Sequence, residues 1–248
     1  MNSAQFTDGK GLAMIDHFKS KNAEGNAANR VLDAMENQVW QGSRFQRFCA
    51  RRMLGIILGS TVVILMLPIM LLIGLIICLD SPGPALFFQK RLGQGCNPFT
   101  FVKFRTLYVD ARERFPELYA YKYTAEQLVD LKFKVDADPR VTRCGTWLRR
   151  SSLDELPNFW NVITGEMALV GPRPEIPEML PYYRGAMLMK FSVRPGVTGP
   201  AQISGRGRLT FYDTVALDLD YVKNRSFRRD VVLLFSTVHK VILRDGAF

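Results

Sequence analysis

Residues 53–79 form an uninterrupted apolar segment, and this segment constrains the fold of the chain more than any other feature. Its sequence, MLGIILGSTVVILMLPIMLLIGLIICL, contains no charged residue. A helix needs roughly 20 apolar residues to cross a bilayer, so the segment is long enough to do so. It begins too deep in the chain and runs too long to be a cleavable signal peptide. The sequence therefore predicts a membrane segment that stays in the protein.

Two features of residues 53–79 bear on whether the segment crosses the membrane. Basic residues precede and follow it in similar number, so the tendency of positive charge to stay in the cytoplasm gives no clear direction. Pro68 lies near the middle, where it removes a backbone hydrogen bond and can bend or break a helix. The residues alone favour a kinked membrane-spanning helix, with a helix–break–helix that dips into one leaflet as the alternative. The flanking basic residues are Arg44, Arg47, Arg51 and Arg52 on one side and Lys90, Arg91, Lys103 and Arg105 on the other.

Charge and residue usage limit the classes of function. The chain of 248 residues carries a formal net charge of +10, which implies a polyanionic partner such as anionic lipid, a nucleotide diphosphate or nucleic acid. Its two histidines disfavour Ser-His-Asp catalysis and histidine-rich metal sites. Its four cysteines form no C-x-x-C pair and are too scattered for a zinc site or a disulfide framework. We therefore expect one domain with appendages, whose chemistry rests on carboxylates.

Two short segments that follow the apolar run are predicted to pair as a β-hairpin. ALFFQKR at 85–91 and PFTFVKFR at 98–105 have the residue types of strands. The intervening LGQGCN contains two glycines, which suit a turn. Beyond the hairpin, apolar stripes at 176–191 and 227–243 predict helices that lie in the core or at the membrane interface.

Residues 149–174 bring cations and adjacent acids together. The stretch reads RRSSLDELPNFWNVITGEMALVGPRP, in which Asp154 and Glu155 are neighbours, an arginine pair begins at Arg149, and Arg173 stands between two prolines. Arginines can hold phosphoryl oxygens through charge-assisted contacts, while a carboxylate binds Mg²⁺ or attacks phosphorus. The stretch is therefore a candidate site for chemistry on a phosphate.

The same residues allow a purely structural interpretation. Residues 152–155 fit a helix capping box, and acids in the first turn of a helix complement its dipole. Pro157 counts against this interpretation, because a helix capped at Ser152 would place the proline in its second turn rather than its first. From the residues alone, capping is the commoner reason for such a pattern, and both alternatives remain open.

Several motifs in the same order resemble those of a known family. SSLDELPNFWNV followed by GEMALVGPRP is similar to the signature of the bacterial sugar transferases, the monotopic phosphoglycosyl transferases that load a sugar phosphate onto a polyprenol phosphate. The similarity covers roughly residues 47–248 and includes KFRTL at 103–107 and FSVRPGVTGPAQISGR at 191–206. Leucine stands at 107 where the family has methionine, and Pro200 stands where it commonly has leucine.

The resemblance implies an α/β fold: a mostly helical, membrane-associated domain with a small β-hairpin and an N-terminal re-entrant membrane hairpin of the helix–break–helix type. It reverses the preference for a spanning helix, because the family's membrane element breaks at a Ser-Pro pair. Here Leu67 precedes Pro68 at the expected bend, so the serine hydroxyl is missing. The implied organisation is a polar N-terminal arm at 1–43, the re-entrant membrane helix at 44–80 and a cytoplasmic catalytic domain with interfacial helices at 81–248.

The resemblance also implies the reaction. A UDP-sugar would donate its sugar-1-phosphate to a polyprenyl phosphate such as undecaprenyl phosphate, with release of UMP. Asp154 would attack the β-phosphorus, and the lipid phosphate would then attack the phosphosugar–aspartyl intermediate. Mg²⁺ would be held by Asp154 or Glu155, and Glu155 would position either the metal or the nucleophile. The implied substrate-binding residues are Lys103, Arg105, Arg149, Arg173, Arg194 and Gln202.

The implied setting is the inner leaflet of the bacterial cytoplasmic membrane, with the catalytic domain on the cytoplasmic face and a role in exopolysaccharide or glycoconjugate assembly. A homo-oligomer is left open. A hypothesis from a different class is a non-catalytic, membrane-anchored basic protein that binds nucleic acid or anionic lipid, which the charge alone supports equally well. An acidic pair among arginines suits nucleic acid poorly, so we expect no nucleic-acid partner.

Overall fold

The computed structural model describes residues 42–132, 138–205 and 208–243 of the chain. The expected polar arm at 1–43 therefore lies almost entirely outside the described residues. The described part is mostly helical with two small sheets, which confirms the expected balance of helix and strand.

The longest element is helix α3, Gly42–Asp80, which contains the whole apolar segment. Its part from Ala50 to Asp80 is long and apolar enough to cross a membrane, with a mean hydropathy of 3.2. Only 11% of its most apolar window is buried against the protein, whereas a core helix of a soluble protein would be mostly buried. Most of the large apolar side chains of α3 therefore face away from the folded domain.

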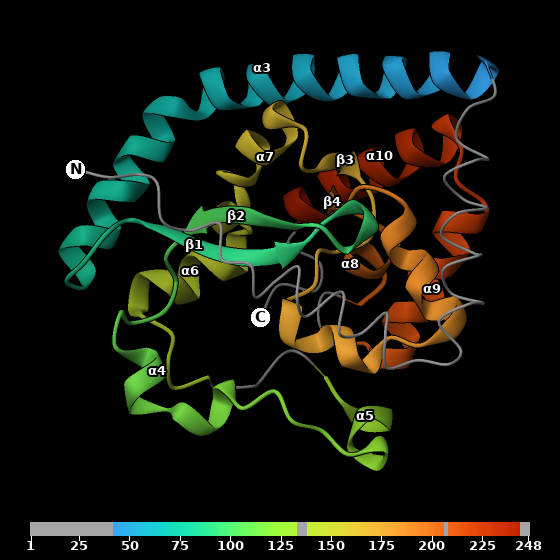
Figure 1. Cartoon of the computed structure of the whole chain (residues 1–248). Coiled ribbons are helices and arrows are strands. Elements are labelled where there is room, and N and C mark those ends of the chain that lie inside the picture. Colours follow the sequence, from blue (N-terminus) through green and yellow to red (C-terminus); the bar gives the residue numbers. More distant parts are fainter. Residues whose placement is uncertain (1–41, 133–137, 206–207, 244–248) are drawn as a thin grey trace, which may run out of the picture.

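Pro68 lies inside α3, yet the helix is one continuous element. Figure 1 shows that α3 runs along the top of the molecule and then bends downward. A proline removes one hydrogen bond of the helix and clashes with the preceding turn, so we attribute the bend to Pro68. The structure thus has the single bent helix that the residues alone favoured, and not the break at Leu67 and Pro68 that the resemblance implied.

Both halves of α3 pack against the same domain. Near its beginning, Gly55 and Gly59 let α3 approach helix α7, Asn158–Thr164, so closely that an added Cβ at either glycine would lie 3.3 Å from an α7 side chain. Near its end, Ile73 and Ile77 are buried in a cluster with Leu148 of helix α6, Arg143–Ser151. The bend therefore lets one helix follow two faces of the domain.

Strands β1, Leu86–Leu92, and β2, Pro98–Phe104, form an antiparallel hairpin joined by the short 3₁₀ helix η1, Gln94–Cys96. The hairpin confirms the prediction from residues 85–105. Leu86 pairs with Phe104 and Leu92 with Pro98, so the odd-numbered residues of both strands lie on one face. These odd-numbered positions of β1 are half-buried, whereas its even-numbered positions from 86 to 90 are exposed.

A second sheet, which the sequence did not predict, consists of strands β3, Ala168–Val170, and β4, Gly196–Thr198, in parallel. Gly171 and Gly196 allow this approach, because an added Cβ at Gly196 would lie 2.0 Å from the Gly171 nitrogen. The pairing fixes the loop that follows β3.

The remaining described elements are short helices and two longer ones near the end of the described residues. They are α4 Ala111–Arg114, η2 Pro116–Tyr119, α5 Ala125–Asp130, η3 Leu153–Glu155, η4 Pro177–Tyr182, η5 Gly185–Ser192, α8 Pro200–Gly205, α9 Phe211–Lys223 and α10 Phe227–Leu243.

The core consists of three clusters, and they show where the two predicted apolar stripes lie. Met179, Tyr183 and Phe191 are buried in one cluster with Phe211 of α9, so the stripe at 176–191 lies in the core. The stripe at 227–243 forms the amphipathic helix α10, which packs inward through part of its surface and exposes Val232, Phe235 and Val238. The three exposed side chains leave α10 with an apolar outer face.

Candidate active site

The two adjacent acids lie in a tight turn between α6 and α7. Ser152 ends α6 with a left-handed backbone conformation, φ 59°, which is uncommon for a residue with a side chain. Its side chain makes no capping hydrogen bond, and α7 begins only at Asn158, after Pro157. The capping-box interpretation is therefore wrong. The reversal at Ser152 instead turns Asp154 inward, where it is 8% exposed.

Asp154 is surrounded by cations from three different parts of the chain. Burial and, after it, the charge of Glu155 raise the pKa of its carboxyl to about 6, although Lys103, Arg173 and Arg149 oppose both effects. A carboxyl with a pKa near 6 is mostly ionised at neutral pH. Its carboxylate is also less solvated than one at the surface, which suits it to act as a nucleophile.

Arg173 reaches the acids from the loop after β3. Its Nη1 donates to Glu155 Oε1 over 2.9 Å, and the side chain remains half-exposed. The charge of Glu155 is the main reason that the pKa of Arg173 is raised. Prolines on both sides restrict the backbone of the loop. Arg173 is therefore held beside the acids while part of its guanidinium stays open to a ligand.

Lys103 comes from β2 and shares the half-buried face of the hairpin with Phe87, its partner across the strands. Its Nζ lies 5.6 Å from the centre of the Phe87 ring. Burial lowers the pKa of Lys103 to about 8, with Asp154 opposing this effect and Arg91, Arg149 and Arg173 adding to it. The ammonium group is therefore charged at neutral pH and loses its charge under mildly alkaline conditions.

Arg91 joins these cations, although the sequence analysis did not place it in the site. Burial, followed by the positive charge of Arg173, lowers its pKa to about 10. Its Nη1 donates to the Pro174 carbonyl oxygen over 3.0 Å, and its Nε and Nη2 donate to Gln89. The sequence could have placed Arg91 in the site, because the alternation of side chains along the hairpin puts Arg91 and Lys103 on the same face.

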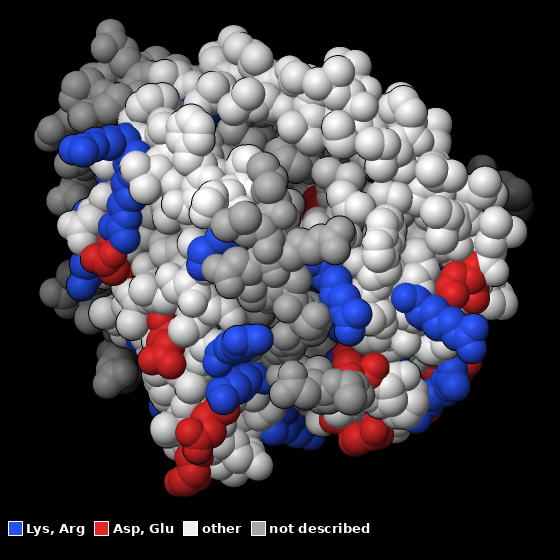
Figure 2. Space-filling model, turned by 180° about the vertical axis from the view of Figure 1, so that it is seen from behind, with Lys and Arg blue, Asp and Glu red and all other residues white. Residues whose placement is uncertain are grey.

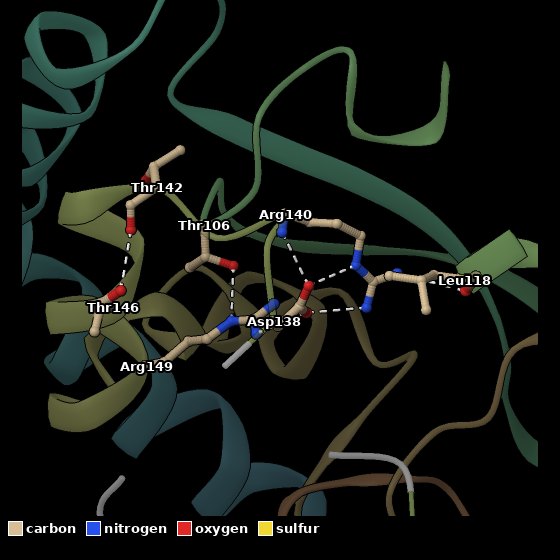
Figure 3. Close-up of polar contacts among 7 residues, drawn as sticks. All are labelled: Thr106, Leu118, Asp138, Arg140, Thr142, Thr146 and Arg149. Carbon is tan, nitrogen blue, oxygen red and sulfur yellow. Dashed lines mark hydrogen bonds and ion pairs between the residues drawn. The ribbon is translucent and has the colours of Figure 1, made fainter. Parts of the chain in front are cut away.

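Arg149 projects from α6 between two other segments. Its Nε lies 3.2 Å from Thr106 Oγ1, and its Nη1 lies 3.5 Å from Asp138 Oδ2. Figure 3 shows the side chain directed toward both residues. Its charge lowers the pKa of Asp154 and of Lys103, so Arg149 belongs to the same electrostatic cluster.

Arg105 lies two positions after Lys103 but makes different contacts. It is 4% exposed, and its guanidinium donates to carbonyl oxygens at 81–84, the turn that follows α3. The shortest of these contacts is 2.7 Å, to Pro84. Its hydrogen bonds are thus made within the protein, and we assign Arg105 to the support of the turn and not to substrate binding.

Arg194 and Gln202 are also placed outside the cluster around Asp154. The pKa of Arg194 is lowered by burial and by the charges of Arg52 and Arg225, which places it near the beginning of α3. Gln202 lies beside Gly199, where an added Cβ would be 2.7 Å from Gln202 Oε1. Both atoms of its side-chain amide are buried and have no hydrogen-bond partner among the described residues.

Asp154 and Glu155 offer two carboxylates that could hold a divalent cation. Among the described residues, no group of three or more His, Cys, Asp or Glu side chains is arranged to hold a metal. Mg²⁺ is commonly held by one or two carboxylates together with substrate phosphates and water. Two adjacent carboxylates therefore fit Mg²⁺ when a diphosphate supplies the remaining oxygens, whereas they would not form a closed site for zinc.

Comparisons with known proteins agree on one family. A family model described as bacterial sugar transferase matches residues 45–244. The UDP-galactose-lipid carrier transferase of Erwinia amylovora is 36% identical over 218 residues, covering 88% of this chain and 45% of the relative. The undecaprenyl-phosphate galactose phosphotransferase of Salmonella typhimurium is 34% identical over 218 residues, with the same two coverages.

A shorter relative matches over most of its length. The exopolysaccharide production protein ExoY of Rhizobium meliloti is 36% identical over 199 residues, covering 80% of this chain and 88% of the relative. By contrast, the chain spans less than half the length of the Erwinia and Salmonella relatives. The matched part includes the whole cluster around Asp154.

Proposed function

This chain belongs to the bacterial sugar transferase family, and we propose that it transfers a sugar-1-phosphate from a UDP-sugar to polyprenyl phosphate, such as undecaprenyl phosphate. Relatives named undecaprenyl-phosphate glucose phosphotransferase and UDP-glucose:undecaprenyl-phosphate glucose-1-phosphate transferase support these substrate classes. The observation that carries the proposal is the buried Asp154 among the cations Lys103, Arg149 and Arg173. This arrangement suits attack on a phosphorus atom whose oxygens are negatively charged.

In the first step, a carboxylate oxygen of Asp154 attacks the β-phosphorus of the UDP-sugar. A bond forms between this oxygen and phosphorus, and the bond from phosphorus to the bridging oxygen breaks, so that UMP leaves with the electron pair. Because Asp154 is mostly ionised at neutral pH, no separate base is needed to activate it. The product of this step is a phosphosugar bound to the aspartate.

In the second step, a phosphate oxygen of the polyprenyl phosphate attacks the same phosphorus atom. The new bond joins the two phosphates, and Asp154 leaves as a carboxylate, ready for another cycle. A covalent intermediate lets a soluble nucleotide and a membrane lipid use one site in turn. The products of the full reaction are polyprenyl diphosphate sugar and UMP.

The cations of the site act on the phosphoryl oxygens. Arg173 is held by Glu155 and half-exposed, so it can contact a phosphate without losing its place. Lys103 and Arg149 lie on the other elements that surround Asp154, which allows charge to be neutralised from several directions. Such donors are already in position before the reaction, and this is the condition under which they stabilise a transition state most.

Mg²⁺ held by Asp154 and Glu155 would neutralise part of the charge of the diphosphate. Glu155 has a second role in the proposal, because it fixes Arg173 through their ion pair. The negative charge of Glu155 also raises the pKa of Asp154. The two acids therefore have different roles, one as the nucleophile and the other as an organiser of the site.

We further propose that α3 enters and leaves the same leaflet. Near its beginning, Arg51 pairs with Asp230 of α10 over 2.8 Å. At its end, Asp80 accepts a hydrogen bond from the Cys144 backbone nitrogen over 3.0 Å. A spanning helix would place its two ends on opposite sides of a hydrocarbon layer about 30 Å thick. Two ends anchored to one folded domain favour the re-entrant course.

The distribution of charge supports a domain that rests on the membrane. In Figure 2 charged side chains gather mainly in the lower half of the view, whereas the upper part, where α3 lies, is almost uncharged. Trp160 on α7 is more than half-exposed, and so are Val232, Phe235 and Val238 on α10. We propose that these residues contact the interface of the inner leaflet from the cytoplasmic side, where a lipid phosphate is within reach of Asp154.

The proposal is tested by purifying the protein in nanodiscs with undecaprenyl phosphate and Mg²⁺ and measuring UMP release from a panel of UDP-sugars. UMP release that requires the lipid, the metal and Asp154 would support the reaction and identify the donor. If no donor gives UMP while lipid or nucleic acid binds equally to the protein and to Asp154→Asn, the non-catalytic binding protein becomes the better explanation.

A further inference from the structure

We propose that Asp138 is a positioning residue of this site, and that together with Thr106 it holds the Arg149 guanidinium among the groups that surround Asp154. The inference rests on the proposed function, since it assigns a task within that site. Asp138 touches neither of the two acids in the described contacts, so its effect is exerted through Arg149.

Two residues from different segments bind the Arg149 side chain. Thr106 Oγ1 accepts from Nε over 3.2 Å, and Asp138 Oδ2 pairs with Nη1 over 3.5 Å (Figure 3). Within the described residues, Nη2 has no hydrogen-bond partner. Two of the three nitrogens thus orient the guanidinium, and the third can contact a phosphoryl oxygen.

Asp138 is itself rigidly held, as a positioning residue must be. Arg140 donates from Nε to Oδ1 over 2.8 Å and from Nη2 to Oδ2 over 2.9 Å, and its backbone nitrogen donates to Oδ1 over 3.1 Å. The Asp138 side chain is 6% exposed. Burial raises its pKa, but the contacts with Arg140 and the charge of Arg149 bring it below the ordinary value. Asp138 is therefore a fixed anion between two arginines.

Thr106 is fixed by the beginning of α6. The Thr142 backbone nitrogen donates to the Thr106 carbonyl oxygen over 3.0 Å. Gly145 lies so close that an added Cβ would be 2.1 Å from this oxygen. Because Gly145 and Arg149 are four residues apart, they share one face of α6, and the close approach at Gly145 brings Arg149 to the Thr106 side chain. Both contacts of Arg149 are thus built into the fold.

A positioning role and a direct charge effect predict different dependences on Arg149. If Asp138→Asn acts by freeing Arg149 to move away, its effect disappears once Arg149 itself is replaced. If Asp138→Asn only removes a negative charge near the site, its effect is the same with and without Arg149.

The first experiment measures kcat for UMP release at pH 7.5 for Asp138→Asn, Asp138→Glu and Thr106→Val. We expect Asp138→Asn and Thr106→Val to lower kcat about 10- to 100-fold, as displaced catalytic groups do. Asp138→Glu keeps the carboxylate and should recover part of the activity. Asp110→Asn is the matched control, because it breaks an exposed ion pair with Arg114 elsewhere and should leave kcat unchanged.

The second experiment repeats Asp138→Asn in an Arg149→Ala background. If Asp138 acts through Arg149, its substitution lowers kcat no further there. Equal losses in both backgrounds would overturn the positioning role. An inactive wild-type protein would instead refute the proposed reaction. In that case UDP binding, measured for the wild type, Asp138→Asn and Arg149→Ala, still tests the inference, and an affinity of Asp138→Asn equal to that of the wild type would count against it.

Discussion

The Arg173 guanidinium donates to a Glu155 carboxylate oxygen over 2.9 Å, and this ion pair joins two motifs that lie 18 positions apart. One motif carries the buried acid and the other carries the arginine between prolines. The pair is partly exposed, so we do not expect it to contribute much to stability. The ion pair instead keeps a cation beside Asp154, and substitutions of these residues should therefore change the activity.

Asp154→Asn should abolish UMP release, because an amide cannot form the phosphosugar intermediate. We expect a decrease of at least about 10³-fold, typical for loss of a nucleophile. Sedimentation with liposomes should be unchanged, since the membrane contacts lie on α3 and α10. The measurement is UMP release with the preferred UDP-sugar, with Asp110→Asn as control. Residual activity near the wild-type level would exclude Asp154 as the nucleophile.

Arg173→Ala should lower turnover much more than it lowers membrane association. Loss of one prepositioned donor costs about 10²- to 10³-fold in kcat, whereas one partly exposed charge adds only about 1 kcal/mol to lipid binding. Arg173→Lys keeps the charge but not the fork geometry, so its turnover should lie between those of the wild type and Arg173→Ala. Intact turnover combined with lost membrane binding would contradict the assignment.

The activity should decrease as the pH falls through about 6, because Asp154 must be ionised to attack.

The ionised carboxylate of Asp154 should also lower the stability of the fold. Its folded-state pKa is raised above the ordinary 3.8, so the folded state binds more protons between pH 4 and 6 and the free energy of unfolding falls as the pH rises. The shift corresponds to about 3 kcal/mol. Asp154→Asn should therefore melt at a higher temperature than the wild type at pH 7.5, and the difference should shrink toward pH 4.

A second pH limit should appear on the alkaline side. The pKa of Lys103 is about 8, so its ammonium group loses its charge as the pH rises through that value, and kcat should decrease. Lys103→Arg keeps the charge at all accessible pH values and should remove this limb, provided that it retains measurable activity. An unchanged alkaline limb in Lys103→Arg would assign the titration to another group.

The course of α3 predicts which sites are reached by an impermeant thiol reagent. In a cysteine-free background, we expect cysteines introduced at Ala50 and at Glu117 to react from the cytoplasmic side only. Inside-out membrane vesicles should therefore be labelled at both positions and intact spheroplasts at neither. Labelling of the two positions from opposite sides would establish a spanning helix and refute the re-entrant course.

Several features were predictable because they depend on neighbouring residues. The apolar run predicted the exposed helix α3, and the strand-type segments at 85–91 and 98–105 predicted each end of the hairpin strands to within one residue. The short strands β3 and β4 were missed because three residues carry no usable pattern, and they pair in parallel only through glycines that lie far apart in the chain.

The sequence by itself thus determined the apolar helix, the hairpin and the adjacent acids, because each of them depends only on residues that are neighbours in the chain. Only the tertiary structure decided which cations meet Asp154. It brought in Arg91, which shares the inner face of the hairpin with Lys103, and it directed Arg105 to the turn after α3. It also replaced the expected cap at Ser152 by a left-handed reversal. The physical reason is that side-chain direction and burial depend on segments that are distant in sequence and adjacent only after folding.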